Sequence, residues 1–194
     1  MKKVFTFLIA LATVLTVSCK KDKKETNVVE EDTNVTVEKT EDGEVKKLTI
    51  ALNAKSNSNA SGNIVFVEEN GIVTMTAIIS GLSEGMHAIH LHEKADCSAP
   101  DGTSTGGHWN PTGQPHGKWG MEEGFHKGDI GNFEANADGN GTITFSTDQW
   151  CIGCGDETKD ILGKAVIVHE GQDDFVTQPT GAAGGRVSCG GIIE

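Results

Sequence analysis

The sequence predicts an all-β domain, an eight-stranded antiparallel β-sandwich or flattened barrel with two long functional loops. Short runs in which apolar and polar residues alternate are separated by turn signals, and no segment shows the periodicity of an amphipathic helix. The chain also contains 25 glycines and no tyrosine, a composition typical of a loop-rich β protein. A length of 194 residues gives no reason to expect a second folded domain.

The predicted strands begin at Lys46. They are the run 46–54, the hairpins 62–79 and 132–146, the histidine-rich run 86–92, and the runs 163–170 and 185–193. In the first run Leu48, Ile50 and Leu52 share one face, and Asn70-Gly71 is a strong hairpin signal within the second.

Two Gly- and Pro-containing stretches, 93–128 and 171–185, have no strand pattern. Loops of this length in a compact domain are usually functional, so we expect them to carry the site.

Residues 1–19 resemble an export signal, with Lys2 and Lys3 ahead of an apolar stretch at 4–17 that is too short for a stable membrane helix. Cys19 directly follows the small Ser18, which resembles a bacterial lipoprotein cleavage site. We therefore expect a protein exported to the bacterial cell envelope, in the periplasm or at the outer membrane, and lipid-anchored through Cys19. The alternative is an ordinary secretory signal without an anchor.

Residues 20–45 carry alternating charges and contain no Phe, Trp, Leu or Ile. Such a segment cannot bury enough apolar area to order itself, so we expect a flexible tether ahead of a domain at 46–194.

The formal charge is −12, and loss of Lys2 and Lys3 with the leader would lower it to −14. Nucleic acid is not an expected partner, because phosphate binding needs clustered basic residues. An anionic substrate would need a local positive group to overcome this charge.

Three of the seven histidines lie in the run 86–92. Side chains alternate across a strand, so His90 and His92 share one face and His87 lies on the other. His169 ends a strand beside a loop. A lone histidine at such a place is usually structural, and a His-x-His pair alone is only suggestive.

The long loop adds His108, His116 and His126, with Asp129 three residues after His126. This set is compatible with a zinc site of three nitrogen ligands and one oxygen ligand. The joint pattern of histidines near loops therefore favours metal binding over a structural role.

Besides Cys19 there are four cysteines, Cys97, Cys151, Cys154 and Cys189, which allow three pairings in an oxidising compartment. For Cys151-Ile-Gly-Cys154 we expect a local structural disulfide. A redox pair or half of a zinc knuckle are the alternatives.

Five motifs, GLSEGMHAIHLHEKADC, GGHWNP, HKGDIGN, GKAVIVHE and GGRVSCGGI, resemble in order and spacing those of the copper–zinc superoxide dismutases. The resemblance covers residues 46–194 and implies a Greek-key β-sandwich or flattened barrel.

The resemblance also implies roles for individual residues. Copper would be held by His90, His92, His108 and His169, and zinc by His108, His116, His126 and Asp129, so that His108 bridges the two ions. Asp173 would link a copper ligand to a zinc ligand, Arg186 would guide the substrate, and Cys97 would pair with Cys189. His87 would pack against backbone without binding metal.

The implied activity is that of an enzyme that dismutates superoxide to dioxygen and hydrogen peroxide and so protects the cell envelope. The cofactors would be copper, cycling between Cu(II) and Cu(I), and zinc. The substrate is a small anion, a membrane would be touched only through the lipid anchor, and the sequence leaves open whether the chain is a homodimer. The rival functions are a copper-binding or copper-delivery protein on the same fold, a copper-only variant and a purely structural sandwich.

Overall fold

The computed structural model describes residues 28–29, 35–40 and 43–193. The predicted export signal, Cys19 and most of the predicted tether lie outside these residues. In the described part, no helix has the length and apolar character needed to span a membrane.

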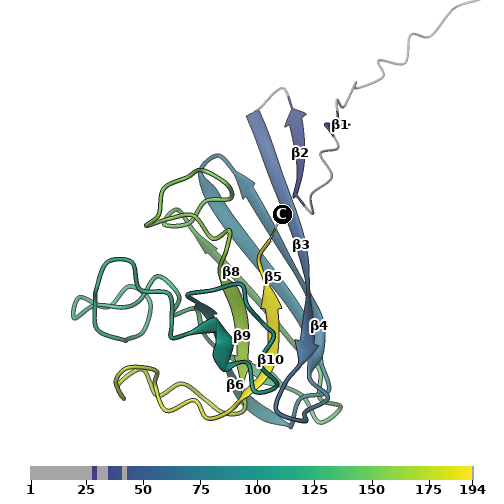
Figure 1. The fold of residues 1–194 in the computed structure, drawn as a ribbon, viewed down its shortest axis with the longest axis vertical. Helices are drawn as coiled ribbons and strands as arrows, with labels where there is room; N and C mark the ends of the chain where they lie inside the picture. Colours follow the sequence, from purple (N-terminus) through teal and green to yellow (C-terminus); the bar gives the residue numbers. More distant parts are fainter. Residues whose placement is uncertain (1–27, 30–34, 41–42, 194) are drawn as a thin grey trace, which may run out of the picture.

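Eight antiparallel strands close into a barrel, as the sequence predicts (Figure 1). They are β3 (Gly43–Ala54), β4 (Ser61–Glu69), β5 (Ile72–Ser80), β6 (Gly85–His92), β7 (Gly131–Ala135), β8 (Gly141–Thr147), β9 (Ala165–His169) and β10 (Arg186–Gly191). The order around the barrel is β3-β10-β9-β6-β7-β8-β5-β4, and pairing of β4 with β3 closes the ring. Crossings from β5 to β6 and from β8 to β9 connect strands that are not neighbours, which gives the Greek-key arrangement.

Alternation along the strands fills the barrel with apolar side chains. In β5, for example, Val73, Met75, Ala77 and Ile79 are buried, while the residues that alternate with them are exposed or half-buried. Asn70 and Gly71 connect β4 to β5 with φ angles of 51° and 76°, the left-handed conformations that a two-residue hairpin turn requires.

The N-terminal region differs from the expected tether. Residues 35–40 form β2 (Val35–Thr40), which pairs with the first half of β3 from Gly43 to Leu48, and the two-residue strand β1 (Val28–Val29) pairs with β2. Strand β10 pairs with β3 only at Asn53 and Ala54, so the rest of that edge is available to β2. Backbone pairing with the free part of the β3 edge can give a strand to a segment whose composition offers few large apolar residues, which composition alone does not predict.

Both predicted loops are present, as residues 93–130 between β6 and β7 and residues 170–185 between β9 and β10. The first contains a 3₁₀ turn, η1 (Thr103–Thr105). Figure 1 shows the first loop projecting from the side of the barrel at the left and the second loop at the lower end, on the side away from β2.

The structure contains both of the predicted disulfides. Cys97 at the start of the first loop is joined to Cys189 in β10, across a sequence separation of 92 residues. Cys151 is joined to Cys154 within the segment that follows β8.

Candidate metal centre

Strand β6 places its histidines on two faces, as the alternation predicts. His87 shares the barrel-interior side with Ile89 and Leu91, which belong to the apolar core. His90 and His92 lie on the outer side, where the loops cover them completely.

His169 and His108 reach the same outer surface from other parts of the chain. His169 is the last residue of β9, which pairs with β6 through His90 and its neighbours. His108 is in the long loop and forms an isolated antiparallel bridge with His92.

These four histidines form one buried group. The ring centroid of His108 lies 4.0 Å from that of His90 and 5.1 Å from that of His92, and the rings of His90 and His169 are 5.0 Å apart. One ring nitrogen from each of the four lies within 4.8 Å of the others, so the group could hold a single ion.

A second buried group shares His108 with the first. It contains His108, His116, His126 and Asp129, again with ligand atoms within 4.8 Å of one another. The ring centroids of His116 and His126 lie 5.3 Å and 5.7 Å from that of His108. Asp129 Oδ2 also accepts hydrogen bonds from the backbone N–H groups of Gly117 and His126, which fixes its carboxylate in place.

Six buried ring nitrogens in these groups have no hydrogen-bond partner in the described part of the chain. They are His90 Nδ1, His92 Nε2, His108 Nε2, His116 Nδ1, His126 Nδ1 and His169 Nε2. Buried polar atoms are normally paired, so a cluster of unpaired nitrogens indicates ligands that converge on ions.

Hydrogen bonds from the opposite ring nitrogens fix the tautomers that metal binding needs. His92 Nδ1 lies 3.0 Å from the Gly106 carbonyl and His169 Nδ1 lies 3.3 Å from the Gly184 carbonyl. A carbonyl can only accept, so both Nδ1 atoms carry the proton and both Nε2 atoms keep a lone pair. The residues of both groups therefore fit metal ions that accept imidazole ligands, which include copper and zinc.

Asp173 connects the two groups. Its Oδ2 lies 2.8 Å from His90 Nε2 and its Oδ1 lies 3.0 Å from His116 Nε2, and all three side chains are buried. Asn132 holds Asp173 through two hydrogen bonds to its backbone. Hydrogen bonds from His116 and His90 outweigh burial and hold the pKa of Asp173 below its usual range, so the carboxylate is charged.

Three histidines of the first group have a lowered pKa. Burial, followed by the neighbouring histidines, lowers the pKa of His169 to about 3, and burial lowers that of His108 to about 4 despite the opposing effect of Asp129. The pKa of His92 is likewise lowered by burial and by His108. Neutral imidazoles at neutral pH have lone pairs available for a metal ion.

His116 in the second group behaves in the opposite way. Burial lowers its pKa, but the carboxylates of Asp129 and Asp173, each 3.0 Å from one of its ring nitrogens, outweigh burial and raise the pKa to about 9. A cation bound at this site would therefore replace a proton on His116.

Arg186 lies beside the first group, at the start of β10 and paired with His169. Its Nη1 donates to the Gly102 carbonyl and to Thr105 Oγ1, at 2.8 Å and 2.9 Å, and its Nη2 donates to the Gly106 carbonyl at 2.8 Å. The Gly106 carbonyl is also the one that orients His92, so the same loop turn positions the guanidinium and a candidate ligand.

His87 belongs to neither group. Its Nδ1 lies 2.8 Å from the His169 carbonyl and its Nε2 lies 2.9 Å from the Ser83 carbonyl. The expectation that this histidine packs against backbone agrees with these contacts.

Three residues that support the site were not singled out from the sequence. Gln178 makes two hydrogen bonds to the backbone of His116, Thr105 holds Arg186, and Gly181 packs directly against Asp173. The contacts of Gln178 and Thr105 join segments far apart in sequence, with separations of 62 and 81 residues, and only Gly181 has a local signal, the glycine at a positive φ.

Comparisons with known proteins agree with this geometry. The family model described as copper/zinc superoxide dismutase (SODC) matches residues 60–192. The crystal structure of a SOD-like protein from Bacillus subtilis is similar, with a TM-score of 0.67, 29% identity, and coverage of 75% of this chain and 97% of that chain. A double mutant of that protein is 30% identical with a TM-score of 0.66 and the same coverage. The chain belongs to the copper/zinc superoxide dismutase family.

Proposed function

We propose that this protein dismutates superoxide at a copper–zinc centre. Copper would be held by His90, His92, His108 and His169, and zinc by His108, His116, His126 and Asp129. The observation that carries the proposal is that one buried histidine, His108, belongs to both groups and that the other members also present unpaired nitrogens or carboxylate oxygens to them.

When bound, copper would supply a one-electron couple that oxidises one superoxide and reduces the next, while zinc has no redox chemistry. Two superoxide ions and two protons then give one dioxygen and one hydrogen peroxide. The protein must therefore bind an anion and supply protons in a buried place.

Hydrogen bonds orient the rings of the candidate copper ligands and set which ring nitrogen carries a proton. His92 and His169 are oriented by loop carbonyls, and His90 is oriented by Asp173. In this proposal His108 Nε2 is the atom that holds the proton destined for peroxide. The other nitrogen of that ring lies 2.8 Å from Asp129 Oδ1, and both residues belong to the candidate zinc group, which would hold the ring in place.

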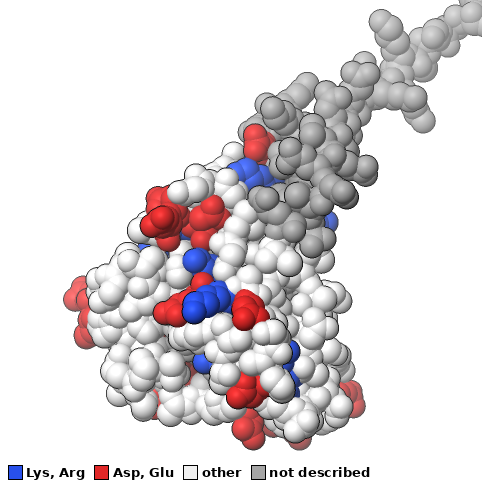
Figure 2. Space-filling model, in the orientation of Figure 1, with Lys and Arg blue, Asp and Glu red and all other residues white. Residues whose placement is uncertain are grey.

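Arg186 supplies the positive group that an anionic substrate needs. Figure 2 shows acidic side chains spread over the visible face with fewer basic ones among them, consistent with the formal charge of −12. Long-range attraction of superoxide is therefore absent, and the half-buried guanidinium beside His92 and His169 provides attraction at short range. Loop residues 173–186 contain no lysine, so steering by that loop is not part of the proposal.

The test is superoxide consumption by protein of measured copper and zinc content, with and without cyanide. Copper-dependent, cyanide-sensitive turnover supports the proposal. Stoichiometric copper binding without turnover would instead assign the chain as a copper-binding or copper-delivery protein.

We also propose, from the sequence of residues 1–19, that the protein is exported to the cell envelope and anchored by a lipid on Cys19. Expression in a bacterial host with a labelled fatty acid tests this. Labelling of the native chain, but not of a Cys19→Ala variant, supports the anchor, and an unlabelled native chain contradicts it.

A further inference from the structure

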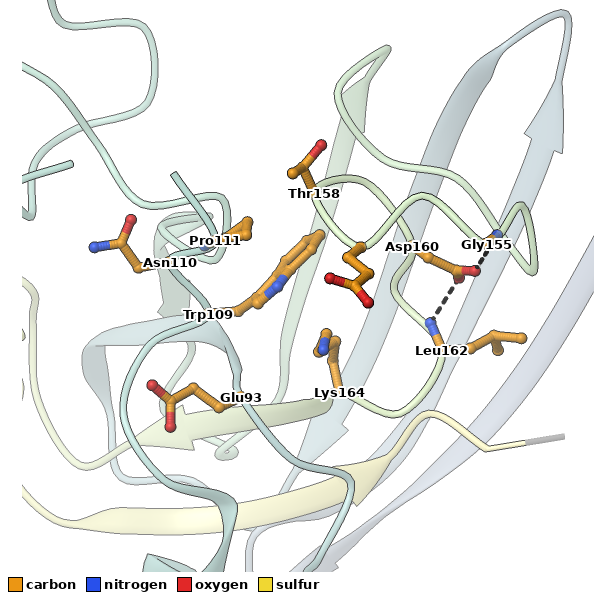
Figure 3. Close-up of a pocket in the computed structure, with 10 residues that line it drawn as sticks. Glu93, Trp109, Asn110, Pro111, Gly155, Thr158, Asp160, Leu162 and Lys164 are labelled. Carbon is orange, nitrogen blue, oxygen red and sulfur yellow. Dashed lines mark hydrogen bonds between the residues drawn. The ribbon is translucent and has the colours of Figure 1, made fainter. Parts of the chain in front are cut away.

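The part of the first long loop that carries His108 is anchored to the barrel beside the pocket shown in Figure 3. Trp109, the next residue, lines this pocket of about 600 Å³, and the Lys164 ammonium lies 5.6 Å from the centre of its ring. The backbone N–H of Trp109 donates to the carbonyl of Leu91 in β6 at 2.8 Å. The backbone around His108 is therefore positioned by a strand of the barrel.

His126, in the same loop, is anchored by a turn of its own. Its backbone N–H donates to Asp129 Oδ2 at 2.8 Å, and its carbonyl accepts a hydrogen bond from the Asp129 N–H at 3.1 Å. Two candidate ligands of the second group thus fix each other over four residues. These backbone contacts of His108 and His126 do not involve the loop 170–185.

His116 is anchored differently, because the loop 170–185 holds its backbone. Its N–H donates to Gln178 Oε1 at 2.9 Å, and its carbonyl accepts from Gln178 Nε2 at 2.8 Å. No backbone–backbone hydrogen bond is found at His116 among the residues that the structure describes. Asn and Gln are the side chains that carry a carbonyl oxygen and an NH₂ in one planar group, so one amide satisfies both polar groups of this backbone.

The turn that presents Gln178 is held together within its own loop. The side chain of Asp174 accepts hydrogen bonds from the backbone N–H groups of Val176 and Thr177, at 2.9 Å and 2.8 Å. The Gly181 N–H donates to the Thr177 carbonyl at 2.7 Å. These bonds shape the turn without any contribution from His116, so Gln178 is an anchor for the histidine and not the reverse.

The same loop also contacts the imidazole ring of His116. Asp173 Oδ1 lies 3.0 Å from His116 Nε2, so the loop holds this residue at its N–H, its carbonyl and one ring nitrogen. The other ring nitrogen, Nδ1, is one of the buried nitrogens without a hydrogen-bond partner and lies 3.0 Å from Asp129 Oδ2. The three contacts together direct Nδ1 into the second group.

We propose that Gln178 is a positioning residue that sets the zinc affinity of the second group by fixing the backbone of His116. The inference rests on the proposed zinc site at His108, His116, His126 and Asp129. The hydrogen bonds of the Gln178 side chain go to His116 and to the Val176 carbonyl, and none goes to a candidate copper ligand in the described part of the chain. The effect of Gln178 is therefore on zinc binding and not on copper binding.

The test is chelator competition on zinc-loaded and on copper-loaded protein, for the native chain and for Gln178→Met. Methionine has a similar length but offers neither the donor nor the acceptor of the amide. We expect zinc affinity to fall about tenfold, as when a group that orients a metal ligand is removed, and copper affinity to stay within about twofold. Gln172→Met is the matched control, because Gln172 is exposed in the same loop and makes no side-chain hydrogen bond among the described residues, and both affinities should be unchanged.

Hydrogen exchange of the zinc-loaded protein reads the contact itself. The His116 amide should exchange faster in Gln178→Met than in the native chain, because its acceptor is lost, while the Trp109 amide, bonded to Leu91, should keep its rate.

Native zinc affinity in Gln178→Met, an equal loss of zinc and copper affinity, an equal loss in Gln172→Met, or an unchanged exchange rate at His116 would overturn this inference and leave the proposed zinc site standing. A native chain that binds no zinc would overturn both.

Discussion

At the scale of single residues, the metal centre depends on side chains that are held in place by specific hydrogen bonds to the loop 93–130. His92 Nδ1 and Arg186 Nη2 share the Gly106 carbonyl, and Thr105 Oγ1 accepts from Arg186 while donating to the Gly102 carbonyl. The guanidinium therefore has three acceptors that hold it still beside the candidate copper ligands. Pre-organised charge of this kind acts without rearrangement when the substrate arrives.

Replacing Arg186 with alanine removes this charge. We expect activity per bound copper to fall by about tenfold or more, because local positive fields raise the capture of anions by about 10–10³. Arg186→Lys should retain part of the activity, since it keeps the charge but loses the three-acceptor geometry. Metal content is measured alongside by elemental analysis, and equal activity of Arg186→Ala at matched copper loading would rule out the role.

Thr105 is a positioning residue for Arg186. Its side chain is fully buried, so Thr105→Val should leave Arg186 with one fewer acceptor and lower both activity and azide affinity at the copper site by about threefold to tenfold. Azide affinity is followed by optical titration of the copper-loaded protein. Thr105→Ser keeps the hydroxyl and should keep both the activity and the azide affinity near those of the native chain. Equal activity and equal azide affinity in Thr105→Val and Thr105→Ser would contradict the role.

At the scale of elements, β6 and β9 supply the rigid half of the site and the two loops supply the rest. The loop 170–185 approaches the second metal group so closely that one residue must lack a side chain. A Cβ on Gly181 would lie 1.7 Å from Asp173 Oδ1 and 2.7 Å from His116 Nε2. Gly181 also has a φ of 69°, so both space and conformation require glycine.

Gly181→Ala should therefore displace Asp173 and weaken zinc binding by about tenfold to a hundredfold, the usual effect of disturbing residues that orient metal ligands. Gly113→Ala is the matched control, because Gly113 has a similar φ of 64° but no atom within 4 Å of the added Cβ. Competition with a zinc chelator measures both affinities. Equal losses in the two variants would show that backbone strain, and not contact with Asp173, is responsible.

The sequence predicts the strands more completely than it predicts the contacts between distant segments. Alternation and the Asn70-Gly71 signal predict the strands because they are local patterns, and the same alternation separates His87 from His90 and His92. The loop pattern of His108, His116, His126 and Asp129 suggested a zinc site, but the sharing of His108 with the other group of histidines was implied only by the family resemblance. Gln178, 62 residues from His116, illustrates the contacts that only the folded chain reveals.

At the scale of the whole molecule, two disulfides close loops of very different length. The Cys97–Cys189 bridge spans 92 residues and the Cys151–Cys154 bridge spans 3. In the chain-entropy description the first contributes about 4–5 kcal/mol to the free energy of unfolding and the second about 2 kcal/mol.

We therefore expect Cys97→Ser/Cys189→Ser to lower the free energy of unfolding more than Cys151→Ser/Cys154→Ser, by roughly 2–3 kcal/mol. Urea denaturation of both double variants, each free of added metal, measures the difference. A larger loss from the 151–154 pair would mean that its bridge stabilises the fold by some means other than loop closure.

Stability of the metal-free protein should depend on pH. The pKa values of His108 and His169 are lowered from 6.5 to about 4 and about 3, so below pH 6.5 the unfolded chain takes up protons that the folded chain does not. The free energy of unfolding should fall from pH 6.5 toward pH 4, by roughly 1 kcal/mol per pH unit for each group. The contribution of His116, with its pKa raised to about 9, is fully present below pH 6.5 and is lost only as the pH rises through 9, so it does not mask the effect.

Urea denaturation between pH 7 and pH 4.5 measures this slope. His169→Gln removes one of the lowered groups and should make the slope shallower. A midpoint that stays constant over this range in the native chain would contradict the burial of neutral imidazoles.

The position of β2 sets the direction in which the molecule would face if it were attached to a bilayer. Figure 1 shows β2 and the beginning of β3 at one end of the long axis and the loop 170–185 at the other. A lipid upstream of β2 would hold the first end near the headgroups, and the loop 170–185 at the other end would face outward. Such a protein would intercept oxidants arriving from the surrounding fluid before they reach the lipid beneath it.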